Sequence, residues 1–173
     1  MINIENTSDF FDSVTLRLYT VIREATGKRA DMMMAPDLLE RGKNYIMTLL
    51  QNAALKEQFK NEPIMFYYNV ASFAFAGGIA YADAWQKDVT QIKLGFVDTL
   101  IASQPDKHAL AMDIMGIESE SEKNAYRGLC DAMFSEFIEL MKPYWEKEDP
   151  RPFLFQGLLA FFQTGINYRT MKK

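Results

Sequence analysis

The segment from Pro63 to Gln86 constrains the fold more than any other part of the sequence. Apart from its tyrosines, Asp83 is the only ionisable residue in this stretch. A helix that is apolar on nearly all sides must be surrounded by protein or by lipid. The sequence therefore predicts a central helix at 63–86, which the remainder of the chain encloses.

A membrane-spanning role for this segment is disfavoured by its interior and by its flanks. The segment is long enough, since a span takes about 20 apolar residues. However, Asn69 and Ser72 interrupt its middle, and acidic residues balance Lys60 and Lys87 at its two ends. A single span normally has an excess of Lys and Arg at one end. We therefore expect a buried helix and no membrane span.

The composition is that of a soluble globular domain, and it argues against several classes of function. The 173 residues fit one domain (1–173), with 49% hydrophobic and 24% charged side chains. The net charge is -4 and basic residues are not clustered, so we expect no nucleic-acid partner. The N-terminal residues lack the pattern of a signal peptide, and one cysteine cannot form an internal disulfide. These two features favour a cytoplasmic location.

A second apolar helix is predicted at about 152–170, because this segment is nearly uncharged until Arg169. Apolar residues at spacings of three and four predict further helices at about 8–26, 36–60, 88–103, 105–115 and 120–147. We expect a break near Asn52, and a kink or an end at Pro143. No segment alternates polar and apolar residues as a strand does. The predicted fold is all-α, a single-domain bundle of six to seven helices around the two apolar helices.

The two apolar helices resemble one another when the sequence is shifted by 87 residues. Gly78-Ile79-Ala80-Tyr81 falls on Gly165-Ile166-Asn167-Tyr168, and Phe75 falls on Phe162. Two buried helices can share such residues without a common origin, because buried helices favour them. The alternative is a duplicated three-helix unit, with pseudo-repeats at 8–86 and 88–171. In that case the two apolar helices would pack near a pseudo-twofold axis.

Patterns for catalysis and metal binding are weak in this sequence. His108 is the only histidine, and no Glu-x-x-His or His-x-x-x-His pair accompanies it, so the di-iron bundle pattern is missing. A histidine near the start of a short helix is usually solvated. Cys130 falls on the apolar face of its predicted helix, where a free cysteine acts as a small hydrophobe. We therefore predict no catalytic residue, no metal and no cofactor.

Polar side chains embedded in the apolar helices are the best candidates for a binding site. Asn69 and Ser72 lie on one stripe of the central helix, and Gln156 and Gln163 lie on the corresponding stripe of the last helix. A buried amide without partners costs about 1–3 kcal/mol. Either the stripes hydrogen-bond in a packed core, or they form the polar end of an apolar pocket. In the second case the ligand-binding residues are Asn69, Ser72, Phe73, Gln156, Gln163, Phe66 and Tyr81.

Three functions fit these observations. The first is a non-enzymatic cytoplasmic helical module that binds a hydrophobic small molecule or a partner helix between the apolar helices. The second is a purely structural protein-interaction subunit, for example of a homodimer or another homo-oligomer. The third is an enzyme of unknown class with an apolar pocket, in which Tyr81 and Asp83 would act. The 13% aromatic residues and 11 methionines favour the first function.

Overall fold

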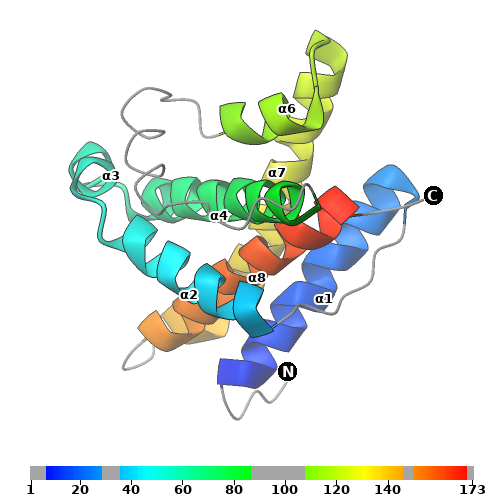
Figure 1. Ribbon diagram of the computed structural model, residues 1–173. Coiled ribbons are helices and arrows are strands. Elements are labelled where there is room, and N and C mark those ends of the chain that lie inside the picture. The colour runs from blue at the N-terminus through cyan, green and yellow to red at the C-terminus, as the bar shows by residue number, and fades with distance from the viewer. Residues whose placement is uncertain (1–6, 29–35, 87–107, 146–149, 171–173) are drawn as a thin grey trace.

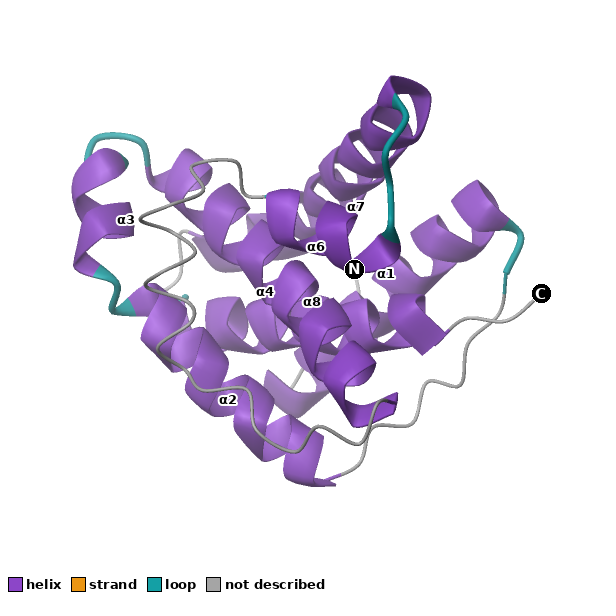
Figure 2. Cartoon of the chain, turned by 45° about the horizontal axis from the view of Figure 1, so that its top comes forward, coloured by secondary structure: helices purple, strands orange, loops and turns teal. Residues whose placement is uncertain are grey.

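The computed structural model describes residues 7–28, 36–86, 108–145 and 150–170 (Figure 1). These residues form seven helices and no strand (Figure 2), which confirms the predicted all-α bundle. The helix predicted at 88–103 and the start of the one predicted at 105–115 lie outside the described residues. The seven helices are α1 (Thr7–Thr26), α2 (Pro36–Leu50), α3 (Ala53–Gln58), α4 (Pro63–Gln86), α6 (Ala109–Met115), α7 (Glu120–Trp145) and α8 (Arg151–Thr170).

Local chemistry fixes several of the helix ends. The predicted break at Asn52 separates α2 from α3, and its side-chain oxygen accepts a hydrogen bond of 3.0 Å from the Leu55 N–H. Gly27 and Gly116 follow α1 and α6 with φ of 70° and 69°, the left-handed conformation that commonly ends a helix. Pro143 lies inside α7, whose described part runs to Trp145, and the kink or end predicted at this proline stays a prediction.

The two apolar helices α4 and α8 pack against each other at the centre of the fold (Figure 1). The helices α2 and α6 pack against α4, whereas α1 runs along α8 and also contacts α7. Every residue at 69–82 in α4 and at 157–167 in α8 is buried. The rest of the protein therefore covers these uncharged segments and shields them from solvent.

By length and composition alone, Pro63–Asp83 of α4 is also the one described segment that could cross a membrane. The core helix of a soluble protein passes the same test, and 67% of its most apolar stretch is buried inside this protein. The lack of a membrane span therefore stays a prediction.

Glycines allow α4 and α8 to approach each other so closely that their backbones are in contact. A Cβ atom added to Gly78 would overlap the carbonyl oxygen of Phe162, and one added to Gly165 would overlap the carbonyl oxygen of Phe75. The Cβ built on Gly165 would also lie 3.1 Å from the Cα atom of Gly78. At this crossing the two helices leave no room for any side chain, so the seam between them is closed.

The aromatic contacts around the crossing are reciprocal under the shift of 87 residues. The rings of Tyr81 and Phe162 have centroids 5.4 Å apart, and the rings of Phe75 and Tyr168 also have centroids 5.4 Å apart. A shift of 87 residues places Tyr81 on Tyr168 and Phe75 on Phe162, so it converts the first pair into the second. The crossing therefore has a local twofold arrangement, and duplication of the whole three-helix unit stays a prediction.

An ion pair joins the C-terminal parts of α4 and α8. The Asp83 carboxylate accepts hydrogen bonds of 2.7 Å and 3.2 Å from two nitrogens of the Arg169 guanidinium. The side chain of Asp83 is only 14% exposed, so removing Arg169 would leave a largely buried carboxylate without this partner. This contact gives Asp83 a structural role, and Tyr81 packs against aromatic rings rather than beside a free carboxylate.

We expect Gly78→Ala to lower the free energy of unfolding by about 2 kcal/mol, because the added methyl group collides with backbone rather than with a movable side chain. Gly128→Ala is the matched control, since a Cβ atom at this position of α7 meets nothing within 4 Å. The control should be more stable than the wild type by about 0.5–1 kcal/mol. Urea unfolding followed by circular dichroism measures both values, and equal stability of the two variants would contradict the described crossing.

Candidate functional site

Three of the predicted ligand-binding residues lie in the packed interior of α4. The Asn69 side chain is buried and donates a hydrogen bond of 2.8 Å to the Met65 carbonyl of its own helix. Ser72 and Phe73 are buried too, and the carbonyl oxygen of Phe73 accepts a hydrogen bond of 2.7 Å from the Tyr45 hydroxyl. The amide nitrogen of Asn69 therefore has a hydrogen-bond partner within its own helix.

The other four predicted residues are spread along the two apolar helices. Phe66 lies half-buried near the start of α4, and Tyr81 is buried near its other end, against Phe162. Gln156 is half-buried and Gln163 is buried in α8. None of the seven predicted residues lines either of the two pockets described below, so a ligand-binding role for them stays a prediction.

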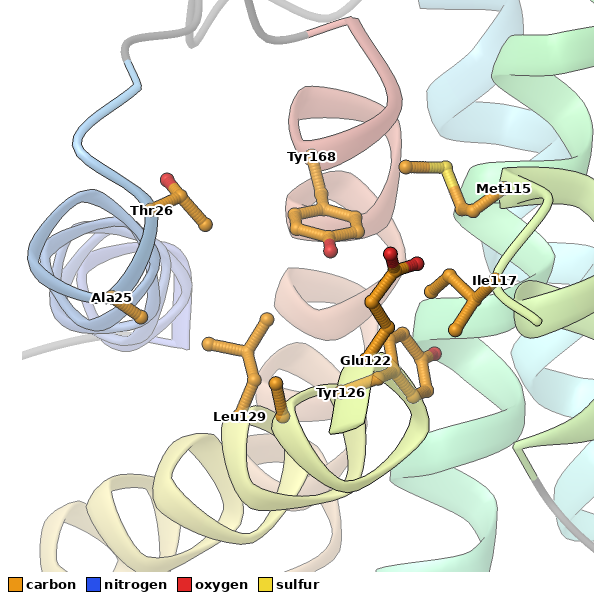
Figure 3. A pocket seen from close by; sticks show the side chains of 9 residues that line it. Ala25, Thr26, Met115, Ile117, Glu122, Tyr126, Leu129 and Tyr168 are labelled. Atoms are coloured by element: carbon orange, nitrogen blue, oxygen red, sulfur yellow. The ribbon is translucent and has the colours of Figure 1, made fainter. Parts of the chain in front are cut away.

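A pocket of about 260 Å³ lies outside the α4–α8 crossing, where the ends of α1, α6, α7 and α8 meet. It opens to the surface, and its volume is slightly below the range of about 300–1,000 Å³ that is typical of ligand sites. Helix ends supply most of its wall, namely the last turns of α1, α6 and α8 and the first turns of α7 (Figure 3). The lining residues are Ala25, Thr26, Met115, Ile117, Glu122, Ala125, Tyr126, Leu129 and Tyr168.

The side chains of Glu122 and Tyr168 reach into this pocket from opposite sides (Figure 3). Ser119 caps α7, and its hydroxyl oxygen accepts a hydrogen bond of 3.1 Å from the Glu122 backbone N–H. The Glu122 carboxylate itself makes no hydrogen bond or ion pair with the described residues. It is turned toward the pocket and is available to a ligand.

Tyr126 forms the buried wall of the pocket. Its ring contacts Tyr168, with centroids 6.5 Å apart, and its hydroxyl points away from Tyr168 (Figure 3). Among the described residues the hydroxyl has no hydrogen-bond partner of good geometry, although it lies beside the thiol of Cys130, a weak acceptor. Burial, with a smaller effect of Cys130, raises the pKa of Tyr126 well above its usual value of about 10. Tyr126 is therefore a neutral side chain.

His108 lies behind Tyr126, and the expectation that it is solvated was wrong. It is only 4% exposed, because it precedes α6 where this helix packs against α4. Its ring stands edge-on to Tyr126, with centroids 5.6 Å apart, and to Tyr68, with centroids 6.4 Å apart. The Tyr68 hydroxyl donates a hydrogen bond to the Asp131 carboxylate. Burial and this hydrogen bond raise the pKa of Tyr68.

A second pocket of about 320 Å³ lies on the other side of Ile117, which lines both pockets. Its wall is mostly polar, with Asp113, Glu118, Lys123 and Arg127 among its lining residues. The two signs of charge are balanced in it, so it selects no class of ligand by charge. The described residues hold no group of three or more His, Cys, Asp or Glu side chains that could bind a metal ion.

Sequence reasoning missed the first pocket. Neither Tyr126 nor Glu122 is among the predicted ligand-binding residues. These residues are brought together with Ala25 and Tyr168 by the packing of helices that are far apart in the sequence. The one available signal was Tyr168, whose counterpart in the shifted sequence, Tyr81, is a predicted site residue.

No protein-family model matches the sequence, and no curated protein or solved structure is significantly similar to the chain. The chemistry of the first pocket is therefore the basis for assigning a function.

We expect Tyr126→Phe to leave the free energy of unfolding unchanged or to raise it slightly, because the lost hydroxyl has no good partner and its burial is unfavourable. Tyr45→Phe is the matched change at another buried tyrosine, whose hydroxyl donates to the Phe73 carbonyl. This second variant should lose about 1 kcal/mol. Urea unfolding of both variants makes the comparison, and a larger loss for Tyr126→Phe would contradict the described environment of its hydroxyl.

The raised pKa of Tyr126 also predicts a dependence of stability on pH. Above about pH 10 the unfolded chain releases the proton of this tyrosine, whereas the folded protein retains it. Stability should therefore fall as the pH rises above 10, and it should fall less steeply in Tyr126→Phe, by up to about 1.4 kcal/mol per pH unit. Urea unfolding at pH 8.0, 10.0 and 11.0 measures the difference, and identical slopes for the two proteins would contradict it.

Proposed function

We propose that the protein is a non-enzymatic binding module for a small, mainly apolar molecule, which occupies the pocket between α1, α6, α7 and α8. The observation that carries this proposal is the pocket of about 260 Å³, with apolar walls and a few inward-facing polar groups. Pockets of this composition are typical small-molecule sites, in which apolar contacts give affinity and the polar groups fix orientation.

The rigidity of one wall supports binding in this place. Tyr126 is fixed from behind by Phe75 and His108, with ring centroids 6.0 Å and 5.6 Å away. A ligand that meets a fixed wall loses less conformational freedom of the protein, and this raises affinity. The proposal moves the binding place away from the α4–α8 seam, because that seam is closed by Gly78 and Gly165.

Binding rather than catalysis is favoured by the state of the two tyrosines. Burial raises the pKa of Tyr168 as well as that of Tyr126, so both hydroxyls stay protonated near neutral pH. They serve as neutral walls and hydrogen-bond donors rather than as general bases. His108 is not among the residues that line the pocket.

The alternative of a shared helix between two copies of the chain has less support. The large apolar side chains that are exposed in the described part lie on three different helices. They are Leu16 in α1, Met47 in α2, and Ile64 and Met65 in α4. Single exposed apolar residues of this kind are common in monomers.

We expect Ala125→Phe to abolish binding of a neutral aromatic probe, because a phenyl ring at this lining position fills the pocket. The probe is naphthalen-1-ol, titrated into labelled protein and followed by proton–nitrogen NMR. In the wild type the signals of Thr26, Leu129 and Tyr168 should move first. Ala132→Phe is the matched control, since Ala132 lies two turns further along α7, is exposed and does not line the pocket.

The control should bind the probe as the wild type does. Either of two results would contradict the proposal. In the first, naphthalen-1-ol shifts no NMR signal of a pocket residue in the wild type; in the second, Ala125→Phe binds naphthalen-1-ol as tightly as the wild type does. Circular dichroism spectra and melting curves confirm beforehand that both variants fold.

A further inference from the structure

The side chains that line the pocket carry negative charge only. Among the nine residues that line it, Glu122 is the only one with a charged side chain, and none is basic. Lys123 and Arg127 of the same helix line the second pocket instead. A ligand in the first pocket therefore meets one negative charge and no positive one from the lining side chains.

The dipole of α7 does not cancel this charge. The first turn of a helix carries the equivalent of about half a positive charge. The carboxylate of Glu122 carries one full negative charge, whereas the charge of Glu120 in the same turn is paired with Lys123. The sum in this part of the molecule remains negative.

Aromatic rings stand beside the carboxylate. Tyr168 projects into the pocket next to Glu122 (Figure 3), and the Tyr126 ring is tilted by 56° to the Tyr168 ring. The faces of aromatic rings attract cations within about 6 Å of the ring centre. The thioether of Met115 adds a soft, polarisable contact.

We propose that the ligand is a small organic cation, namely a quaternary or protonated amine that carries apolar groups. This inference rests on the function proposed above and names its class of ligand. The Glu122 carboxylate is exposed and makes no hydrogen bond or ion pair with the described residues, so an organic cation in the pocket can pair with it. A neutral or anionic ligand of the same shape would cover the carboxylate without pairing it, which costs free energy.

Three ligands of one shape test the charge preference. They are choline, its neutral isostere 3,3-dimethylbutan-1-ol, and the anion 3,3-dimethylbutanoate, each titrated into the full-length protein and followed by proton–nitrogen NMR. We expect choline to bind about threefold to tenfold more tightly than the neutral isostere, in line with the strength of cation–π and partly exposed ionic contacts. The anion should bind most weakly of the three.

Glu122→Gln removes the charge and keeps the shape of the side chain. We expect this variant to bind choline about threefold to tenfold more weakly and the neutral isostere unchanged. Glu120→Gln is the matched control, because it removes the same charge from the same turn at a residue that does not line the pocket and forms an exposed pair with Lys123. This control should bind choline within about twofold of the wild type.

The outcomes separate this inference from the proposed function. If naphthalen-1-ol and the neutral isostere bind in the pocket and choline binds no better than the isostere, the inference is wrong and the binding function stands. The inference is equally wrong if Glu120→Gln weakens choline binding as much as Glu122→Gln does. If neither naphthalen-1-ol nor any of the three ligands perturbs the pocket signals, both proposals fail.

Discussion

The fold depends on the close approach of α4 and α8 at Gly78 and Gly165. Two helices without charged faces have to bury almost their whole surface, and a crossing at backbone distance buries more of each than ordinary side-chain packing does. The aromatic residues on either side of the crossing then pack in reciprocal pairs, Tyr81 with Phe162 and Phe75 with Tyr168. The remaining helices cover what these two leave exposed.

At the crossing itself this central pair leaves no space for a ligand. A small-residue groove between two apolar helices is compatible with a cavity or with a tight crossing, and here the carbonyl oxygens of Phe75 and Phe162 fill the groove. The polar groups of α4 find partners within the protein, as the Asn69 amide does with the Met65 carbonyl. The pocket of the proposed function lies instead at the edge of the core, where four helix ends meet.

The sequence was sufficient for the helices and insufficient for the pocket, for a physical reason. Helix positions follow from local signals, such as the nearly uncharged stretch at 63–86 and the expected break near Asn52. The burial of His108 was not predictable in this way, because it depends on how the short helix α6 lies against α4. The meeting of Ala25, Glu122 and Tyr168 likewise depends on the packing of helices that are distant in the chain.

The construction of the pocket from helix termini has a consequence for its energetics. Thr26 and Met115 are the last residues of α1 and α6, Tyr168 lies in the final turn of α8, and Glu122 lies in the first turn of α7. Terminal turns fray at a far lower free-energy cost than the core helices unfold. A molecule that bound in this pocket, as proposed, would contact all four of these helix ends, and part of its affinity would be spent on keeping them folded. Substitutions that strengthen or weaken these caps can tune the affinity while the interior remains as it is.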